Sequence, residues 1–228
     1  MAQRPVQLGV GEPVPGRGEA GGEDSLAGLG SRPSVMVSGS AVGIYGDRGE
    51  ETLTEDSSLG DGFLADVCKE WEAATGPARQ AGIRVVNIRS GIVLSPAGGA
   101  LGRQLPFFKL GVGGRLGSGR QYTSWISIDD EVGGIVHALE TDALDGPVNL
   151  TAPEPVRNAD FTRALGRALG RPAVVPVPKM ALAVVLGSEL ADELLGGQRV
   201  LPSRLAASGY RFAHPELDGA LRHVLGKA

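Results

Sequence analysis

Two short apolar runs, at residues 35–37 and 83–88, flank a segment with a different pattern. Small polar residues bound each run, which is typical of strands buried on both faces of a parallel sheet. Between them, apolar residues recur every three or four positions from Phe63 to Ala74, which predicts a helix with Asp61 as its N-cap. Strand, helix and strand at this spacing predict one βαβ unit with parallel pairing.

The rest of the chain continues to alternate between short extended pieces and helical patterns. Residues 47–61 are polar and predict a surface loop, while the glycine-dense stretch 98–119 predicts a loop and a short helix that cover a cleft. Asp129 is the expected N-cap of one helix, and Gly170 the expected end of another. Further predicted elements are strands near 125–128 and 148–150, helices at 129–140, 158–169, 179–195 and 215–225, and an extended piece at 174–177.

The first 33 residues contain eight glycines and four prolines and have no apolar period. Such a segment buries too little surface to offset the entropy of ordering it, so we predict disorder. A nucleotide-binding enzyme would usually open with a phosphate-cradling loop. Gly9, Gly11 and Gly16 do not have its spacing, and the prolines between them argue against a following helix.

Composition excludes several classes of protein. A net charge of −4 gives no excess of positive charge that would attract nucleic acid or an anionic membrane. One cysteine excludes an intrachain disulfide, and three histidines without a cysteine pair predict no structural zinc site and no other metal. No apolar run has the length of a membrane span, and the N-terminus lacks the apolar core of a secretion signal. We therefore expect a cytoplasmic protein.

Candidate chemistry lies where the two predicted strands end. Ligands of open α/β sheets bind at the carboxyl ends of the strands. The residues at these ends are Ser38, Gly39 and Ser40 after the first run, and Arg89, Ser90 and Gly91 after the second. Each has a plain structural alternative, because a strand-terminal serine also satisfies backbone groups and a Ser-Gly pair also forms a tight turn.

Several sequence pieces in a fixed order resemble one family. They are S-G-S-A-V-G-I-Y-G-D at 38–47, C-K-E-W-E at 68–72, R-S-G-I-V-L at 89–94, G-S-G-R-Q-Y-T-S-W-I-S-I-D-D at 117–130, N-L-T-A-P-E-P-V-R-N at 149–158, G-Q-R-V-L-P-S-R-L at 197–205 and G-Y-R-F-A-H-P-E-L at 209–217. The chain is similar to extended, atypical short-chain dehydrogenase/reductases. The subgroup it resembles comprises NAD(P)-dependent, epimerase/dehydratase-like proteins with a C-terminal domain of unknown function of the DUF1731 type.

This resemblance implies an α/β fold, namely the C-terminal part of a Rossmann-like parallel sheet plus a small mixed α/β lobe on the substrate side. It divides the chain into a disordered N-terminus (1–33), a partial Rossmann-type domain (34–172) and a small C-terminal domain (173–228). It also implies a small, sugar-like substrate and NAD(P) as cofactor. The family's residues that approach the cofactor would be Ser38, Gly39, Arg89, Ser90 and Gly91.

For catalysis the resemblance points to Ser40 and Tyr45, and to Cys68 and Glu72 at roughly the places of the family's usual Tyr-x-x-x-Lys. Ordinary members use a tyrosine whose pKa a lysine lowers. A buried cysteine beside a carboxylate instead has a raised pKa, so Cys68 cannot act in the same way. Cys68 also lies on the apolar stripe of its helix, where a packed thiol is common. The alternative for Tyr45 is that it is only an amphipathic residue at the rim of the cleft.

Arg120, Gln121 and Trp125 are candidate substrate-binding residues, because they come from a glycine-flexible segment that can clasp a polar ligand. A solvated arginine and a core tryptophan are the alternatives. Asp129 is better explained as a helix cap than as a catalyst. His214 and His223 are interpreted as structural residues. Ser127 stands where the subgroup usually has histidine.

The family's N-terminal half, with its glycine-rich loop, has no counterpart in this sequence. We therefore expect a truncated or mis-started version of a longer enzyme in which dinucleotide binding is impaired. A sheet without its first strands would expose an apolar edge that a partner chain could cover. The alternative function is a non-catalytic binding or assembly protein that retains the substrate lobe.

Overall fold

A computed structural model describes residues 32–180 and 195–227 of the chain. Its central feature is a parallel sheet in the order β1 (Val35–Ala41), β3 (Arg84–Ser90) and β7 (Gly146–Leu150). The predictions for residues 1–31, and for most of the helix at 179–195, lie outside the described residues.

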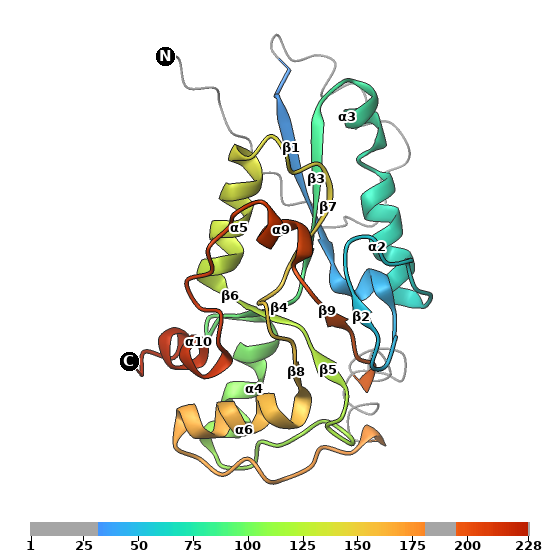
Figure 1. The fold of residues 1–228 in the computed structure, drawn as a ribbon. Coiled ribbons are helices and arrows are strands. Elements are labelled where there is room, and N and C mark those ends of the chain that lie inside the picture. The colour runs from blue at the N-terminus through green and yellow to red at the C-terminus, as the bar shows by residue number, and fades with distance from the viewer. Residues whose placement is uncertain (1–31, 181–194, 228) are drawn as a thin grey trace.

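Helices cover both faces of this sheet (Figure 1). On one side lie α2 (Phe63–Ala73) and α3 (Gly76–Gln80), and on the other lies α5 (Ile128–Glu140). β1 and β3 pair in parallel from Val35 opposite Arg84 to Ala41 opposite Ser90. The predicted βαβ unit is confirmed.

The predicted two-sided burial of the first strand is wrong. Val35, Met36 and Val37 are only partly buried, whereas Val85, Val86 and Ile88 of β3 are buried. The reason is the strand order, because β3 lies between two strands while β1 is at the edge of the three-stranded sheet in the described part of the chain.

A second group of elements packs below the sheet in Figure 1. Its apolar core contains Trp125, Phe108, Phe161 and Leu221. The group comprises helices α4 (Gly99–Lys109), α6 (Asn158–Leu169) and α10 (Leu217–Val224), the parallel pair β4 (Ile92–Leu94) and β6 (Trp125–Ser127), and the antiparallel pair β5 (Tyr122–Thr123) and β8 (Val156–Arg157).

Short elements connect the two groups. β2 (Thr52–Leu53) pairs in parallel with β9 (Arg199–Val200), and α9 (Ser203–Ala207) follows β9 directly. The 3-10 helix η1 (Val42–Tyr45) continues from β1. Leu53 is fully buried, so the surface loop predicted at 47–61 also contains the short strand β2, which the sequence does not predict. The paired strand β9 comes from the far end of the chain, which a local pattern does not reveal.

Both predicted aspartate caps are wrong, whereas the predicted helix end at Gly170 is confirmed. Gly62, not Asp61, precedes α2, and it has a φ of 111° that favours glycine. Ser127, not Asp129, caps α5, because its hydroxyl accepts a 3.0 Å hydrogen bond from the Asp130 backbone N–H. Gly170 ends α6 in the left-handed conformation. Among the described residues, no helix is both long and apolar enough to cross a membrane.

Candidate functional site

Three of the predicted site residues meet in one polar cluster between β1, β3 and α2. Glu72 on α2 accepts hydrogen bonds from Arg89 Nε at 2.7 Å and from a terminal Arg89 nitrogen at 2.8 Å. The Ser40 hydroxyl, at the end of β1, donates to Glu72 Oε1 at 2.9 Å. Strand ends that are neighbours in a parallel sheet, and a helix packed across them, produce this convergence.

Tyr45 extends the cluster toward the third strand of the sheet. Its hydroxyl accepts a 2.9 Å hydrogen bond from Arg89 and donates a 2.8 Å bond to Asn149 Oδ1 on β7. Asn149 in turn donates its backbone N–H to Glu55 at 3.0 Å and its side-chain amide to Leu201 O at 3.0 Å. The network therefore spans all three strands of the sheet.

Burial sets the protonation states in this cluster. It raises the pKa of Tyr45, and the nearby Arg89 only partly offsets that effect. Burial also raises the pKa of the Cys68 thiol, as the sequence predicts for a cysteine beside a carboxylate. For Arg89, burial acts to lower the pKa, but the hydrogen bonds with Glu72 and Tyr45 raise it overall. At neutral pH the phenol and the thiol therefore keep their protons, and Arg89 keeps its charge.

This arrangement differs from a tyrosine–lysine pair that is prepared to move a proton. Tyr45 is fully buried, and its hydroxyl donates its hydrogen bond to Asn149 Oδ1. Cys68 is also buried, within an apolar cluster. Ser40 is also buried, and its hydroxyl donates to Glu72 and lies within hydrogen-bond reach of the Cys68 thiol. The catalytic roles of Ser40, Tyr45, Cys68 and Glu72 stay predictions.

Ser90 lies on the opposite face of β3 and contacts a different carboxylate. Its hydroxyl donates to Glu131 Oε1 in the first turn of α5. Burial raises the pKa of Glu131 to about 7, and the hydrogen bond from Ser90 only partly opposes this. The second carboxylate oxygen of Glu131 is buried and has no hydrogen-bond partner among the described residues. The protonation state of Glu131 therefore changes near neutral pH.

The other predicted cofactor residues have mixed surroundings. A Cβ on Gly91 would come within 2.6 Å of Ser124 O, so close packing against the protein's own backbone explains this glycine. Gly39 is exposed, and a Cβ there would meet no atom within 4 Å. Ser38 is half-buried on β1. Open space beside the strand end thus exists at Gly39, and the cofactor roles of these residues stay predictions.

The predicted substrate-binding residues do not join the cluster. Arg120 is exposed, and its backbone carbonyl accepts a hydrogen bond from Arg157. Gln121 donates its side-chain amide to Leu116 O at 3.0 Å and so holds its own loop. Trp125 is fully buried in the core, where its indole N–H donates to Glu154 O at 3.1 Å, as its core alternative predicts. A substrate role for these residues stays a prediction.

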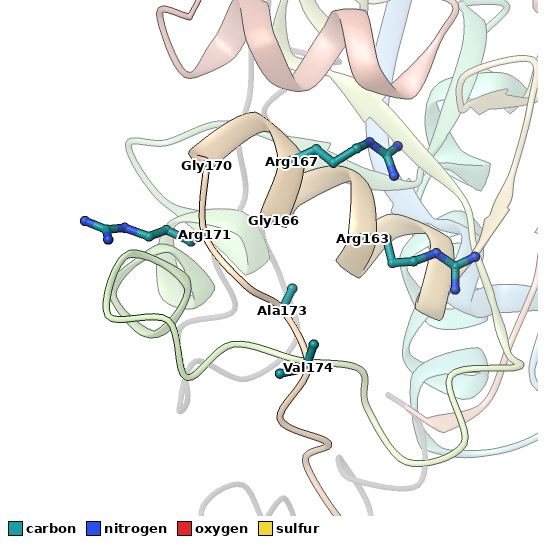
Figure 2. A pocket seen from close by; sticks show the side chains of 7 residues that line it. All are labelled: Arg163, Gly166, Arg167, Gly170, Arg171, Ala173 and Val174. Atoms are coloured by element: carbon teal, nitrogen blue, oxygen red, sulfur yellow. The ribbon is translucent and has the colours of Figure 1, made fainter.

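A pocket of about 370 Å³ opens beside the end of α6. Figure 2 shows that its arginine side chains do not converge, because Arg171 points to the side opposite Arg163 and Arg167. Arg167 is also paired with Asp218 at 2.8 Å. No residue of the Glu72–Arg89 cluster lines this pocket, so we do not identify it with the functional site.

Sequence reasoning missed Asn149, Glu55 and Glu131. Asn149 lies at the end of a parallel strand, so the rule that singled out Ser40 would also have found it. Glu55 and Glu131 carry no local signal, because their partners are 94 and 41 residues away along the chain. Arg89 was predicted at this sheet edge, but its pairing with Glu72 follows only from the packing of α2.

Comparison with known proteins decides the family. Residues 177–224 match the family model described as a domain of unknown function, DUF1731. Epimerase family protein Mb2239 of Mycobacterium bovis is 51% identical over 192 residues, which are 84% of this chain and 64% of that protein. The crystal structure of human epimerase family protein SDR39U1 (isoform 2) with NADPH has a TM-score of 0.84 and 37% identity, covering 90% of this chain and 70% of that one. The chain belongs to the epimerase family.

Other family members and more distant structures confirm the α/β fold and the predicted kinship with extended short-chain dehydrogenases. The nucleoside-diphosphate sugar epimerase of Corynebacterium glutamicum is 39% identical with a TM-score of 0.71, covering 90% of this chain and 40% of that one. UDP-glucose 4-epimerase of Thermus thermophilus, at 21% identity and a TM-score of 0.66, shares the fold. The chain spans 64% of the length of the M. bovis relative.

Proposed function

We propose that this chain carries the substrate side of an NAD(P)-dependent epimerase or related oxidoreductase that acts on a sugar-like small molecule. The observation that carries the proposal is Ser40, which stands at the end of β1 with its hydroxyl oriented by Glu72. A hydroxyl held in this way can accept a hydrogen bond from a sugar hydroxyl. The family relationship and the nucleoside-diphosphate sugar epimerase among the similar structures support a sugar-like ligand.

The cofactor in this proposal is NAD(P), which the NADPH in the human relative's structure supports. Dinucleotide enzymes of this fold bind the pyrophosphate at a glycine-rich turn that leads from a strand into a helix. In the described residues, the turn from β4 into α4 contains Gly98 and Gly99 but lacks the G-x-G-x-x-G spacing. We therefore propose that the 228-residue chain by itself binds dinucleotide weakly.

One stretch outside the described residues has the required spacing. Residues 16–21 read Gly-Arg-Gly-Glu-Ala-Gly. The motif carries meaning only between a strand and a helix, and no apolar run precedes it, while Pro13 and Pro15 stand directly before it. It therefore does not change the proposal of weak dinucleotide binding.

A second candidate function is a non-catalytic binding protein. The bidentate Glu72–Arg89 pair occupies the place that the family resemblance gives to catalytic groups, and burial keeps Tyr45 and Cys68 protonated. In this proposal a partner chain covers the edge of β1 that pairs with no strand among residues 32–180 and 195–227. Binding without turnover distinguishes this function from the first.

Ligand-detected NMR with a panel of nucleoside-diphosphate sugars tests the substrate side. We expect saturable binding of at least one of them, weakened about five- to thirtyfold by Ser40→Ala, since a lost hydrogen bond to a polar ligand costs on the order of 1–2 kcal/mol. Ser34→Ala, at an exposed position before the opposite end of β1, is the matched control and should leave binding unchanged. If no sugar nucleotide binds, or if Ser40→Ala binds as the wild type does, the proposal is wrong.

A further inference from the structure

Three metal-ligating side chains meet on the surface, away from the Ser40 cluster. Asp129 comes from the first turn of α5, His214 from the segment before α10, and His223 from α10 itself. His223 Nε2 lies 2.8 Å from Asp129 Oδ2, and His214 Nε2 lies 3.8 Å from the same oxygen. All three potential ligand atoms lie within 4.8 Å of one another.

These separations fit one metal ion. With metal–ligand bonds of about 2.0–2.2 Å, neighbouring ligand atoms of a tetrahedral site lie about 3.3 Å apart. The observed separations of 2.8 and 3.8 Å from Asp129 Oδ2 lie on either side of that value. The two imidazole rings are stacked with their centroids 4.1 Å apart, so binding of one ion requires the rings to turn until their nitrogen lone pairs converge.

A buried carboxylate holds the backbone of this site in place. Asp130, next to Asp129, accepts hydrogen bonds from the backbone N–H groups of Ala213 at 2.7 Å and His214 at 2.9 Å. Asp130 is almost completely buried. The segment that carries His214 is thus fixed to the start of α5, and such supporting contacts reduce the cost of assembling a metal site.

We propose that Asp129, His214 and His223 bind a divalent transition-metal ion of the zinc class, with water completing the coordination. Two imidazoles and one carboxylate suit zinc, cobalt, nickel or copper better than magnesium or calcium, which prefer oxygen ligands. The side chains of Asp129 and His223 are about half exposed, so an ion can enter from solvent.

The fold, and not the spacing of the residues, brings this set together. Asp129 and His223 are 94 positions apart, so the sequence predicts no metal site and gives the histidines structural roles. The ion would join the first turn of α5 to α10 and would stabilise the folded state by mass action. None of the three ligands belongs to the Ser40 cluster, so this inference does not depend on the proposed function.

The test uses the full chain without a histidine tag, freed of metal with EDTA and then dialysed. Zinc and cobalt are titrated by calorimetry, and bound cobalt is followed by its visible absorption. We expect one ion per chain with micromolar affinity, and a higher melting temperature with zinc. His214→Gln and His223→Gln should each weaken binding at least tenfold. Magnesium should bind far more weakly than zinc.

His137→Gln is the matched control, because it removes the third histidine of the chain, which contacts Ser208 at 2.8 Å and not this site. Melting in EDTA shows that each variant is folded before metal is added. The proposal is overturned if the wild type binds zinc no better than magnesium. It is also overturned if the His214 and His223 variants bind zinc as tightly as the His137 variant does.

Discussion

Replacing Glu72 by alanine tests whether the polar cluster stabilises the fold as a unit. The carboxylate accepts two hydrogen bonds from Arg89, at 2.7 and 2.8 Å, and one from Ser40 at 2.9 Å. The side chains of Arg89 and Glu72 are 4% and 15% exposed, so the substitution leaves a buried guanidinium without its counter-ion. Removing one partner of a buried ion pair costs about 3–5 kcal/mol. We expect the free energy of unfolding to fall by that amount.

Urea unfolding followed by circular dichroism measures this change. Glu70→Ala on the same helix removes an exposed carboxylate and should alter the unfolding free energy by less than about 0.5 kcal/mol. The double variant Glu72→Leu with Arg89→Met replaces both charges by apolar side chains and should recover most of the loss. If Glu72→Ala is no more destabilising than Glu70→Ala, the reasoning about this cluster is refuted.

Two further predictions concern groups at the strand ends. Because burial raises the pKa of Glu131 to about 7 from its ordinary value of 4.5, the folded state holds a proton that the unfolded state has released. Stability should therefore fall as pH rises between these two values, by roughly 3 kcal/mol in total. Urea unfolding at several pH values measures this dependence, which Glu131→Gln should abolish and the exposed Glu140→Gln should leave intact. If the unfolding free energy of Glu131→Gln still falls with pH as it does in the wild type, the raised pKa of Glu131 is contradicted. Gly91→Ala places a Cβ within 2.6 Å of Ser124 O and should lower the free energy of unfolding by about 1–3 kcal/mol. Gly39→Ala places a Cβ that meets no atom within 4 Å and should not change it. Equal melting temperatures of the two variants would refute the close packing at Gly91.

The sequence predicts elements well where one local signal decides them. The apolar runs and the helical period between them predict the βαβ unit, and Gly170 marks the end of α6. The predicted cap of α2 is wrong because the backbone there needs a positive φ, which Gly62 adopts, and the predicted cap of α5 is wrong because tertiary contacts decide among several side-chain acceptors. The Asp129 carboxylate contacts His223 of α10, and Ser127 accepts the hydrogen bond from the Asp130 backbone N–H.

The candidate site is likewise predictable only where a local signal marks a residue. Strand-end rules find Ser40 and Arg89, and the family resemblance finds Glu72, but no rule of spacing pairs Arg89 with Glu72. That pairing requires the angle at which α2 crosses the sheet. The union of Asp129 with His214 and His223 likewise depends on how α10 packs beside α5, so the metal-site proposal could arise only from the structure.

The most direct test of the proposed function is a calorimetric titration of NADPH and NADH into the 228-residue chain, shown by circular dichroism to be folded. The proposal that this chain carries the substrate side, without a complete pyrophosphate site, predicts no binding in the micromolar range. Micromolar binding of either dinucleotide would contradict it, and would mean that residues 16–21 or another segment supplies the phosphate cradle.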